Sequence, residues 1–407
     1  MPVDRPLYLD HHATTPLDPR VLDAMMPFLT GTFGNAASRQ HRFGQVAEDA
    51  VETARGQVAA LIGAASAKEI VWTSGATESD NLALKGVAEA YRERGDHLVT
   101  TRTEHKAVLD ACARLERDGF RVTYLDVDAE GFVTPEAVDA AITEQTILVS
   151  VMLANNEVGT VQPLRAIGEV TRAHGVLLHT DAVQGVGRVP FDVEADRIDL
   201  ASLSAHKIYG PKGVGALYVR RRDPRVRLIA QMDGGGHERG MRSGTLNVPG
   251  IVGMGAAAAL LAEEGEAEAA RIGRLRDALW RRVRTELEAV TLNGPADFMR
   301  RHPGNLNVSF EAVRANDLLV AVADDLALSS GSACSSASIE PSYVMRALGA
   351  DDERAAASIR IGLGRTTTAD DVAFAADTLV AAVAQLRAES PLWALRQEGV
   401  DPASLEW

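Results

Sequence analysis

The sequence predicts an α/β protein built around a mostly parallel sheet, with a second, smaller domain. Between residues 69 and 220, apolar strand-like runs alternate with amphipathic helical patterns. Parallel strands need helical crossovers, so this alternation indicates helices on both faces of one sheet. The chain has 407 residues, which exceeds the usual size of a single domain.

The expected strands follow one another at regular intervals in this first part of the chain. In order, they are EIVWTS from Glu69, HLVTTRT from His97, RVTYLDV from Arg121, TILVSVML from Thr146, VLLHTDA from Val176, DLASLS from Asp199 and GALYVRR from Gly215. Helical runs such as NLALKGVAEAYRERG and LRAIGEVTRAHG lie between them, and each ends at a glycine suited to a C-terminal cap. We therefore predict a sheet of the seven-stranded type.

The composition changes after Gly250. A helical stretch rich in Ala, Glu and Arg runs from about Ile251 to Val290, and a smaller α/β part follows it. That part contains the strand LNVSF at Leu306 and late helices over 370–389. We predict a large domain over residues 16–258 and a small domain formed by residues 1–15 and 259–407.

Charge and composition restrict the classes of partner. The formal net charge of −14 disfavours broad binding to nucleic acid or to a membrane surface. The longest apolar run, GMGAAAALLA from Gly253, is too short to span a bilayer, and the first residues do not read as a signal peptide. The two cysteines, Cys112 and Cys334, exclude a disulfide framework. We expect a cytoplasmic protein.

Polar residues follow five of the predicted strands. Ligands of open α/β sheets bind beyond the carboxyl ends of the strands, so we expect these residues to line one pocket. The groups, in chain order, are Gly75-Ala76-Thr77-Glu78, Glu104-His105, Asn155-Asn156-Glu157, Asp181 with Gln184, and Ser204 with His206 and Lys207.

This set of side chains suits pyridoxal phosphate. The cofactor needs a lysine for its aldehyde, a carboxylate at its ring nitrogen and an anion site at a helix start. Lys207 can supply the amine, and Asp181 can keep the ring nitrogen protonated so that the ring accepts electrons. Residues 75–77 offer backbone N–H groups and a hydroxyl to the phosphate. Ser204 and His206 can add further donors.

Each of these residues also has an ordinary structural interpretation. SGAT at a helix start can be a simple N-cap, and His105 can be a partly buried, hydrogen-bonded histidine. Lys212 competes with Lys207 for the cofactor, and composition does not choose between them. The pair His11 and His12 suggests a metal, but no carboxylate-histidine helix motif accompanies it, so we predict no metal site.

A second candidate centre is SSGSACSSAS, residues 329–338. A structural cysteine usually lies among large apolar residues, whereas Cys334 has only small neighbours, so we expect an exposed thiol. An ordinary thiol is only roughly 3% ionised at neutral pH, so a nucleophilic Cys334 needs a proton acceptor such as His105. The alternative is a serine-rich loop with an incidental thiol. Downstream, Arg360 can bind a substrate carboxylate with its fork, or belong to a surface ion pair.

Taken together, the motifs resemble those of the cysteine desulfurases, a group within the class V aminotransferases. The segments that carry the resemblance are TSGATESDN, TEHKAVL, NNEVGT, DAVQ, SAHKIYGPKG, GGGHERGMRSGT, SSGSACSSASIEPSYV and RIGLGRTT. They occur in order between YLDHHATTPLDPR and GVDPASLEW, and they are most similar to the housekeeping branch that serves iron–sulfur cluster assembly. The resemblance implies a fold-type I pyridoxal-phosphate enzyme that works as a homodimer.

The resemblance also implies a role for each candidate residue. Lys207 rather than Lys212 holds the cofactor, and His105 stacks on its ring and moves protons. Asp181 pairs with the ring nitrogen, and Gln184 donates to the ring hydroxyl. The phosphate contacts are Ala76, Thr77, Ser204 and His206, with Thr245 supplied by the other subunit. The substrate contacts are Asn35, Arg360 and Asn156, the last of which also belongs to the cofactor site.

The implied reaction converts L-cysteine to L-alanine and leaves the sulfur as a persulfide on Cys334. A scaffold protein for iron–sulfur clusters, or an acceptor for tRNA thiolation, would then take the sulfur, with at most a transient contact between a cluster and the persulfide. A selenocysteine lyase or an aminotransferase on the same fold would not need Cys334. A sulfur-relay binding protein would not need Lys207.

Two features of the sequence bear on substrate affinity and on partners. Ala36, Gly362 and Thr366 differ from residues common among the relatives and flank the expected carboxylate site. The C-terminal segment ends in Leu405 and Trp407, and we expect these apolar residues to dock the scaffold protein.

Overall fold

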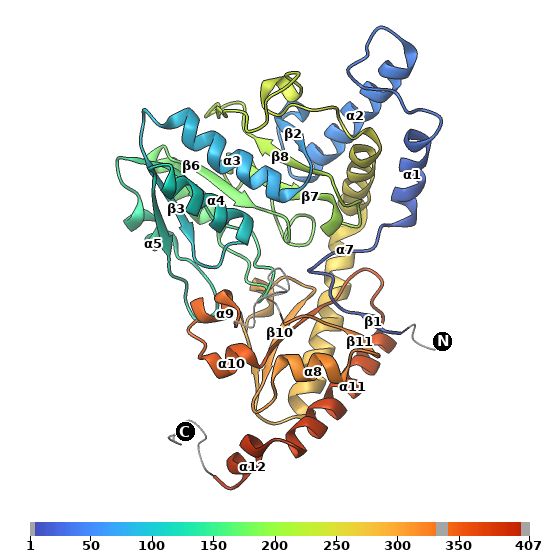
Figure 1. Cartoon of the computed structure of the whole chain (residues 1–407), viewed down its shortest axis with the longest axis vertical. Helices are drawn as coiled ribbons and strands as arrows, with labels where there is room; N and C mark the ends of the chain where they lie inside the picture. Colours follow the sequence, from blue (N-terminus) through green and yellow to red (C-terminus); the bar gives the residue numbers. More distant parts are fainter. Residues whose placement is uncertain (1–4, 331–340, 400–407) are drawn as a thin grey trace.

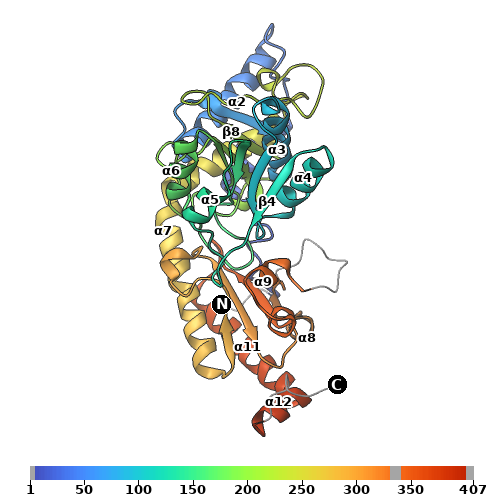
Figure 2. The same ribbon diagram turned by 90° about the vertical axis from the view of Figure 1, so that its left-hand side faces the viewer.

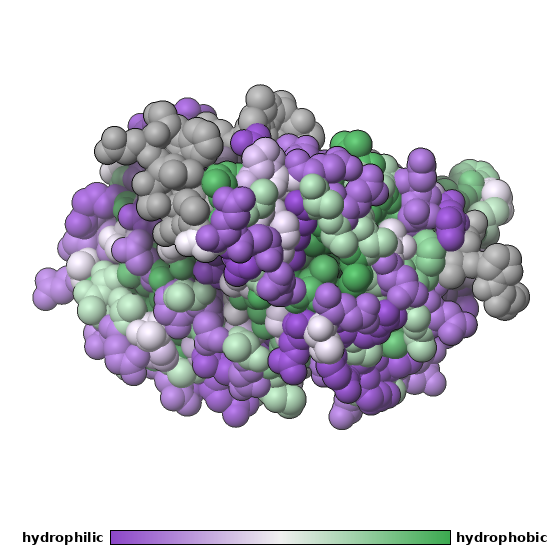
Figure 3. All heavy atoms as spheres, turned by 90° about the horizontal axis from the view of Figure 1, so that it is seen from below, coloured by the Kyte–Doolittle hydropathy of each residue, from purple (hydrophilic) through white to green (hydrophobic). Residues whose placement is uncertain are grey.

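A computed structural model describes residues 5–330 and 341–399 of the chain (Figure 1). Cys334, Leu405 and Trp407 lie outside the described residues. The molecule is elongated, with a larger α/β part at one end and a smaller one at the other (Figures 1 and 2). Seen from the small end, the surface is mostly hydrophilic with scattered hydrophobic residues (Figure 3).

The large part contains the predicted seven-stranded sheet, in the order β2-β8-β7-β6-β5-β3-β4. Only β8 runs antiparallel to its neighbours β2 and β7, and the other pairs are parallel. Apart from the edge strand β4, every residue of these strands is buried, which explains their nearly continuous apolar sequences. The bounds are β2 Ile70–Thr73, β3 His97–Thr101, β4 Arg121–Leu125, β5 Thr146–Ser150, β6 Leu177–Asp181, β7 Leu200–Ser204 and β8 Gly215–Val219.

Helices cover both faces of this sheet, as predicted. On one face, α3 (Ala76–Tyr91) and α4 (Lys106–Arg117) share a core with residues such as Val71 and Leu98. The other face packs Trp72 and Val99 against a second set of helices. This set comprises α1 (Pro19–Leu29), α2 (Arg42–Leu61), α5 (Pro135–Ala141), α6 (Leu164–His174) and the first part of α7 (Val248–Glu286).

The two predicted glycine caps have different outcomes. Gly175 ends α6 in the left-handed conformation, with φ of 63°, as expected. The prediction for Gly95 is wrong, because α3 already ends at Tyr91 and Gly95 does not have a positive φ. Gly95 instead lies against the backbone of Gln145, where an added Cβ would come within 2.2 Å of the carbonyl oxygen. A close approach of two chain segments, not a cap, therefore requires this glycine.

The small part has an antiparallel sheet in the order β12-β10-β9 and a short parallel pair, β1 with β11. Its core contains Leu9 from the N-terminal segment and the C-terminal half of α7 from Ile272 onward, whereas α7 as far as Leu261 packs in the large core. The boundary between the two hydrophobic cores therefore lies within α7, between Leu261 and Ile272. The remaining elements are β1 Leu7–Tyr8, β9 Val290–Leu292, β10 Asn305–Phe310, α8 Ala315–Ala321, β11 Leu326–Ala327, α9 Tyr343–Ala347, α10 Asp352–Ala356, β12 Ser358–Gly362, α11 Ala369–Ala388 and α12 Pro391–Gln397, with four short 3-10 turns at Ala67–Glu69, Ala205–Lys207, Glu238–Gly240 and Phe298–Arg300.

Candidate active site

The candidate residues of the large domain gather at one edge of its sheet. Asp181 is the last residue of β6, and Ser204 is the last residue of β7. Asn156 follows β5, and His105 follows β3 as the N-cap of α4. Since β3, β5, β6 and β7 run parallel, their carboxyl ends meet at the same edge. The sequence argument for one pocket therefore agrees with the register of the sheet.

Lys207 lies in a half-buried position, in a short turn directly after β7. Its Nζ donates to the backbone carbonyls of His12 and Ala13, the latter at 2.8 Å. It also lines a small cavity of about 20 Å³ together with Gln184. The competing Lys212 is exposed in the turn before β8. The geometry thus places one of the two candidate lysines beside the other site residues.

The carboxyl group of Asp181 is buried and accepts a hydrogen bond from the backbone N–H of Val183 at 3.0 Å. Burial raises the pKa of Asp181, while the positive charges that His105 and Lys207 can carry lower it. His105 Nδ1 accepts from the backbone N–H of Ala107 at 3.2 Å, so its Nε2 carries the proton when the ring is neutral. A carboxylate in this place suits a cationic ring nitrogen.

Two further buried carboxyl groups lie near Asp181, and the sequence argument gave them no role. Burial, together with the charge of Asp181, raises the pKa of Asp80 well above its ordinary value. Burial raises the pKa of Glu104 to about 8. Glu104 is therefore mostly protonated near neutral pH, and the charge of Asp181 opposes ionisation of both neighbouring groups. The sequence does give a hint of both residues, because Asp80 lies in TSGATESDN and Glu104 lies in TEHKAVL, close to predicted site residues.

The start of α3 offers a place for an anion. Its N-cap is Gly75, with φ of 151°, and no side chain in the described part of the chain caps the helix. The backbone N–H groups of the first turn, including those of Ala76 and Thr77, therefore remain available, at the positive end of the helix dipole. His206 lies near Lys207, and burial lowers its pKa to about 4, so the ring is a neutral donor or acceptor.

The substrate side of the site comes from the small domain. Arg360 in β12 is buried, and its Nη2 bonds to Asp10 Oδ1 at 2.8 Å. Its Nη1 donates to the carbonyl oxygen of Asn156 at 3.1 Å. Arg360 Nε and Asn156 Oδ1 are buried without a hydrogen-bond partner in residues 5–330 and 341–399. One unsatisfied donor and one unsatisfied acceptor, on two residues that are hydrogen-bonded to each other, indicate a place for a polar ligand.

Two predicted residues are not brought to this edge within one chain. Asn35 is exposed in the loop between α1 and α2, where its side chain accepts from the N–H of Ala37. Thr245 is exposed just before α7. The loop after α1 lies at the end of the large domain that is distant from the small domain (Figure 1).

The sequence argument missed the segment 10–15, which crosses the site between β1 and α1. Thr14 Oγ1 is 3.1 Å from His206 Nδ1, and Thr15 bonds to the backbone carbonyl of His206 through both its N–H and its hydroxyl. His12 contacts Gln184 and Lys207. The signal in the sequence is the polar run HHATT, which directly follows a short apolar strand. Within the described ranges, no group of three or more His, Cys, Asp or Glu could hold a metal ion.

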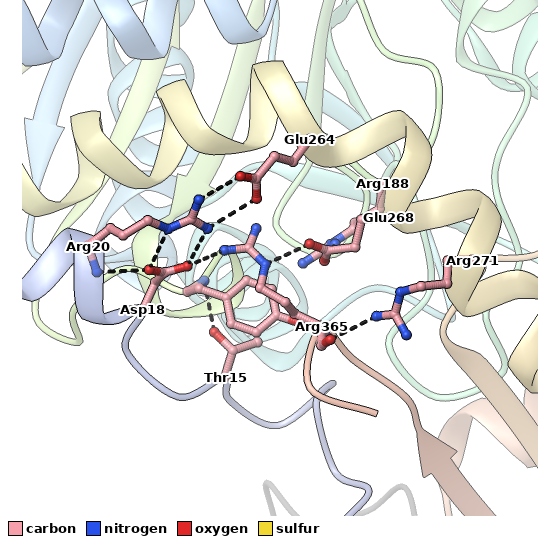
Figure 4. Close-up of polar contacts among 9 residues, drawn as sticks. Thr15, Asp18, Arg20, Arg188, Glu264, Glu268, Arg271 and Arg365 are labelled. Atoms are coloured by element: carbon pink, nitrogen blue, oxygen red, sulfur yellow. Dashed lines mark hydrogen bonds and ion pairs between the residues drawn. The ribbon is translucent and has the colours of Figure 1, made fainter. Parts of the chain in front are cut away.

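A network of ion pairs fixes the two domains to each other beside the site (Figure 4). Arg365, which follows β12, bonds to Asp18 at 2.5 Å and to Glu268 of α7 at 2.6 Å. Arg188 of the large domain also pairs with Glu268. The backbone N–H of Arg365 donates to the hydroxyl of Tyr209, two residues after Lys207. The loop after Lys207 and the strand of Arg360 are thus linked.

These groups fit pyridoxal phosphate. Lys207 can bind its aldehyde, Asp181 can face its ring nitrogen, and the uncapped start of α3 can accept its phosphate.

Comparison with known proteins agrees with this geometry. The family described as aminotransferase class-V matches residues 7–374. A protein of Anaeromyxobacter sp. named cysteine desulfurase IscS is 60% identical over 402 residues, which are 99% of this chain and 98% of the relative. A protein of Aeromonas hydrophila with the same name is 57% identical over 404 residues, with the same coverage.

Solved structures are similar over almost the same range. A NifS-like protein has a TM-score of 0.86 and 37% identity, covering 93% of this chain and 99% of its own. SspA in complex with cysteine has a TM-score of 0.77 and 37% identity, covering 89% of this chain and 99% of its own. The predicted fold class and family resemblance are confirmed. The chain therefore belongs to the pyridoxal-phosphate-dependent class-V aminotransferase family.

Proposed function

We propose that the protein is a cysteine desulfurase, which converts L-cysteine to L-alanine and keeps the sulfur as a persulfide on Cys334. One observation carries the proposal. The large domain brings Lys207 and Asp181 to the edge of the sheet where the small domain places Arg360. The relatives named cysteine desulfurase, at up to 60% identity, support the same reaction.

The residues around the cofactor can manage the protons of this reaction. When bound, the cofactor withdraws electrons from the α-carbon of the amino-acid substrate. The Nζ of Lys207 then accepts the α-proton, since it is the amine that the substrate amine displaces. Asp181 keeps the ring nitrogen protonated. His105 Nε2 would be the ring nitrogen that exchanges a proton with the reacting sulfur, since Nδ1 accepts from the N–H of Ala107.

Arg360 and Asn156 would orient the substrate. A guanidinium fork binds a carboxylate through two parallel hydrogen bonds, and this fork is buried against Asp10. The substrate carboxylate would take the place of the Asp10 carboxylate beside Arg360. The unsatisfied Oδ1 of Asn156 would then accept from the substrate or the cofactor.

Cys334 lies outside the described residues, but its chain neighbours are placed at the site. Ser329 makes two backbone hydrogen bonds with Arg360, at 2.7 and 3.3 Å. On the other side, Ser342 donates to Glu157 at 2.5 Å, and the hydroxyl of Tyr343 donates to the carbonyl of Glu104 at 2.7 Å. Position 334 lies five residues after Ser329, and five residues can span at most about 18 Å, so a nucleophile at position 334 can reach a substrate held by Arg360.

A second copy of the chain would complete the site. Large apolar side chains are exposed on α1, in the loop that follows it and at the start of α2, which favours an interface. The exposed large hydrophobic residues of this region are Leu22, Met26, Leu29, Phe33 and Phe43. In the proposed homodimer, Thr245 contacts the cofactor phosphate of the partner subunit, and Asn35 contacts its substrate.

The persulfide would pass to an iron–sulfur scaffold protein or another sulfur acceptor, with Leu405 and Trp407 as docking residues. We place this reaction in the cytoplasm, without a direct role for nucleic acid. In the part of the chain that the structure describes, no helix is both long and apolar enough to cross a bilayer.

Incubation of the purified holoenzyme with L-cysteine and a small thiol reductant tests the proposal. We expect equal amounts of alanine and sulfide. Cys334→Ser should keep the absorbance of the bound cofactor and bind cysteine, but release almost no alanine. Normal desulfuration by Cys334→Ser would instead favour a selenocysteine lyase. Formation of 3-mercaptopyruvate, with transfer of the amino group to a keto acid, would favour an aminotransferase.

A further inference from the structure

Gln184 and His12 are joined by two hydrogen bonds, although 172 positions separate them in the sequence. Gln184 Nε2 donates to the backbone carbonyl of His12 at 2.9 Å. Gln184 Oε1 lies 3.0 Å from His12 Nδ1. A carbonyl only accepts, so the amide atom that faces it must be the nitrogen. His12 Nδ1 must then carry the proton that the amide oxygen accepts.

The reverse orientation of the amide is unfavourable for the same reason. A rotation by 180° would place the amide oxygen against the carbonyl of His12 and the amide nitrogen against its Nδ1–H. The amide oxygen and the carbonyl of His12, which are both acceptors, would then face each other in a buried place, since the exposed fraction of His12 is 3%. The observed orientation leaves one N–H of Gln184 for a ligand.

We propose that His12 is a positioning residue, which fixes the amide of Gln184 so that the amide presents an N–H rather than an oxygen to the ring hydroxyl of the cofactor. This inference rests on the proposed function, in which Gln184 donates to that ring oxygen. An N–H stabilises the ionised ring oxygen, whereas an amide oxygen would repel it. His12 thereby sets how strongly the ring oxygen holds a proton.

His12 itself is held firmly. Its ring meets that of His302 edge-on, with centroids 4.7 Å apart. Its backbone carbonyl accepts from Lys207 as well as from Gln184. One residue therefore orients the amine that binds the cofactor and the amide that faces the ring oxygen.

The histidines of the pocket do not titrate near neutral pH. The titratable and charged groups that face Lys207 and Gln184 are Asp181, Arg360, Arg188, His11, His12, His206 and His302. Burial lowers the pKa of His11 to about 4, of His12 to about 3 and of His206 to about 4. Burial also places the pKa of His302 well below its ordinary value. A spectral change of the bound cofactor above about pH 6 therefore does not come from His11, His12, His206 or His302.

The first test compares His12→Phe with His12→Asn in the holoenzyme. Phenylalanine keeps a ring without a donor, whereas the asparagine nitrogen can occupy the place of Nδ1. We measure the pH midpoint of the cofactor absorbance and the Kd of pyridoxal phosphate. His12→Phe should raise the midpoint by about one pH unit and weaken binding about tenfold, because the amide of Gln184 keeps only the backbone carbonyl of residue 12 as a partner and no longer holds its other N–H toward the ring oxygen. His12→Asn should keep the midpoint and the Kd close to those of the unaltered protein.

A double-mutant cycle separates positioning from a general structural effect. If His12 acts through Gln184, then Gln184→Ala alone should raise the midpoint by a similar amount. His12→Phe should add almost nothing in the Gln184→Ala background. Additive shifts of the two substitutions would overturn the inference, as would an unchanged midpoint in His12→Phe.

A measurement on the unaltered protein covers the case in which His12→Phe does not fold. Nitrogen-15 NMR of selectively labelled histidine, with the His12 signal assigned through His12→Asn, should show His12 protonated at Nδ1 at pH 7. Protonation at Nε2 alone would contradict the inference, because that ring cannot donate to Gln184. Failure of the unaltered protein to bind pyridoxal phosphate or to release alanine from cysteine would instead count against the proposed function.

Discussion

The two halves of the candidate site are built in different ways. The cofactor half lies on buried parallel strands, where Asp181 ends β6 and Lys207 follows β7. The substrate half depends on contacts between distant segments, of which Arg360 with Asp10 is the clearest. In the first half, backbone register places the side chains, and in the second, ion pairs between domains do so. Substitutions in the two halves should therefore have different effects on the enzyme.

The largest effect is expected in the cofactor half. Lys207→Ala should abolish the absorbance of the covalently held cofactor and the production of alanine, because the amine that moves the α-proton is removed. Lys212→Ala is the matched control, since Lys212 is exposed before β8. Absorbance spectra and alanine assays check both variants. Full turnover in Lys207→Ala would remove the basis of the cofactor assignment.

In the substrate half, Arg360→Lys should separate substrate binding from cofactor binding. Lysine keeps the charge but loses the bidentate fork, so we expect KM for cysteine to rise about tenfold to a hundredfold. The absorbance of the bound cofactor should stay unchanged. An equal loss of cofactor would show that Arg360 supports both halves, which would weaken the comparison.

Arg365→Met tests how the halves are joined. Arg365 pairs with Asp18 and Glu268, and removal of one partner from a largely buried network leaves unpaired carboxylates. We expect the free energy of unfolding to fall by about 2–3 kcal/mol, which urea titration measures. Arg282→Met is a control, because its pairs with Glu286 and Asp377 are more exposed and should contribute less than about 1 kcal/mol.

Acid should weaken the same junction. Hydrogen bonds from Arg20 and Arg365 lower the pKa of Asp18 to about 2. A lowered folded-state pKa stabilises the protein above the unfolded value, near 4, and this contribution is lost as the pH falls toward 2. The free energy of unfolding should therefore decline less between pH 4 and 2 in Asp18→Asn than in the unaltered protein. An identical decline of the free energy of unfolding in the two proteins between pH 4 and 2 would contradict the role of Asp18.

The smallest effect on the enzyme itself is expected from the C-terminal end. Deletion of residues 403–407 should leave desulfuration with a small reductant intact, while sulfur transfer to the scaffold protein drops sharply, because Leu405 and Trp407 are removed. The melting temperature serves as the control for lost packing. Unchanged binding of the scaffold protein by the shortened enzyme would exclude the docking role.

The sequence by itself determined the sheet and most of the cofactor half. Fully buried strands appear as short apolar runs, and the polar residues after them meet because parallel strands share an edge. For this reason, Asp181, Ser204 and Lys207 could be predicted as candidate site residues from the sequence. The motif after each strand can be located from the sequence, because local periodicity shows where the strand ends.

Only the tertiary structure decided which distant segments complete the site. It placed Lys207 in a half-buried position and left Lys212 exposed, brought His12 to Gln184 across 172 positions, and brought Asp10 to Arg360 across 350. Local patterns report which side of an element is buried, but they do not report what packs against it. The polar run of residues 10–15 looks like a loop in the sequence and becomes part of the site because β1 pairs with β11. Contacts of this kind depend on the packing of two domains, which local periodicity does not encode.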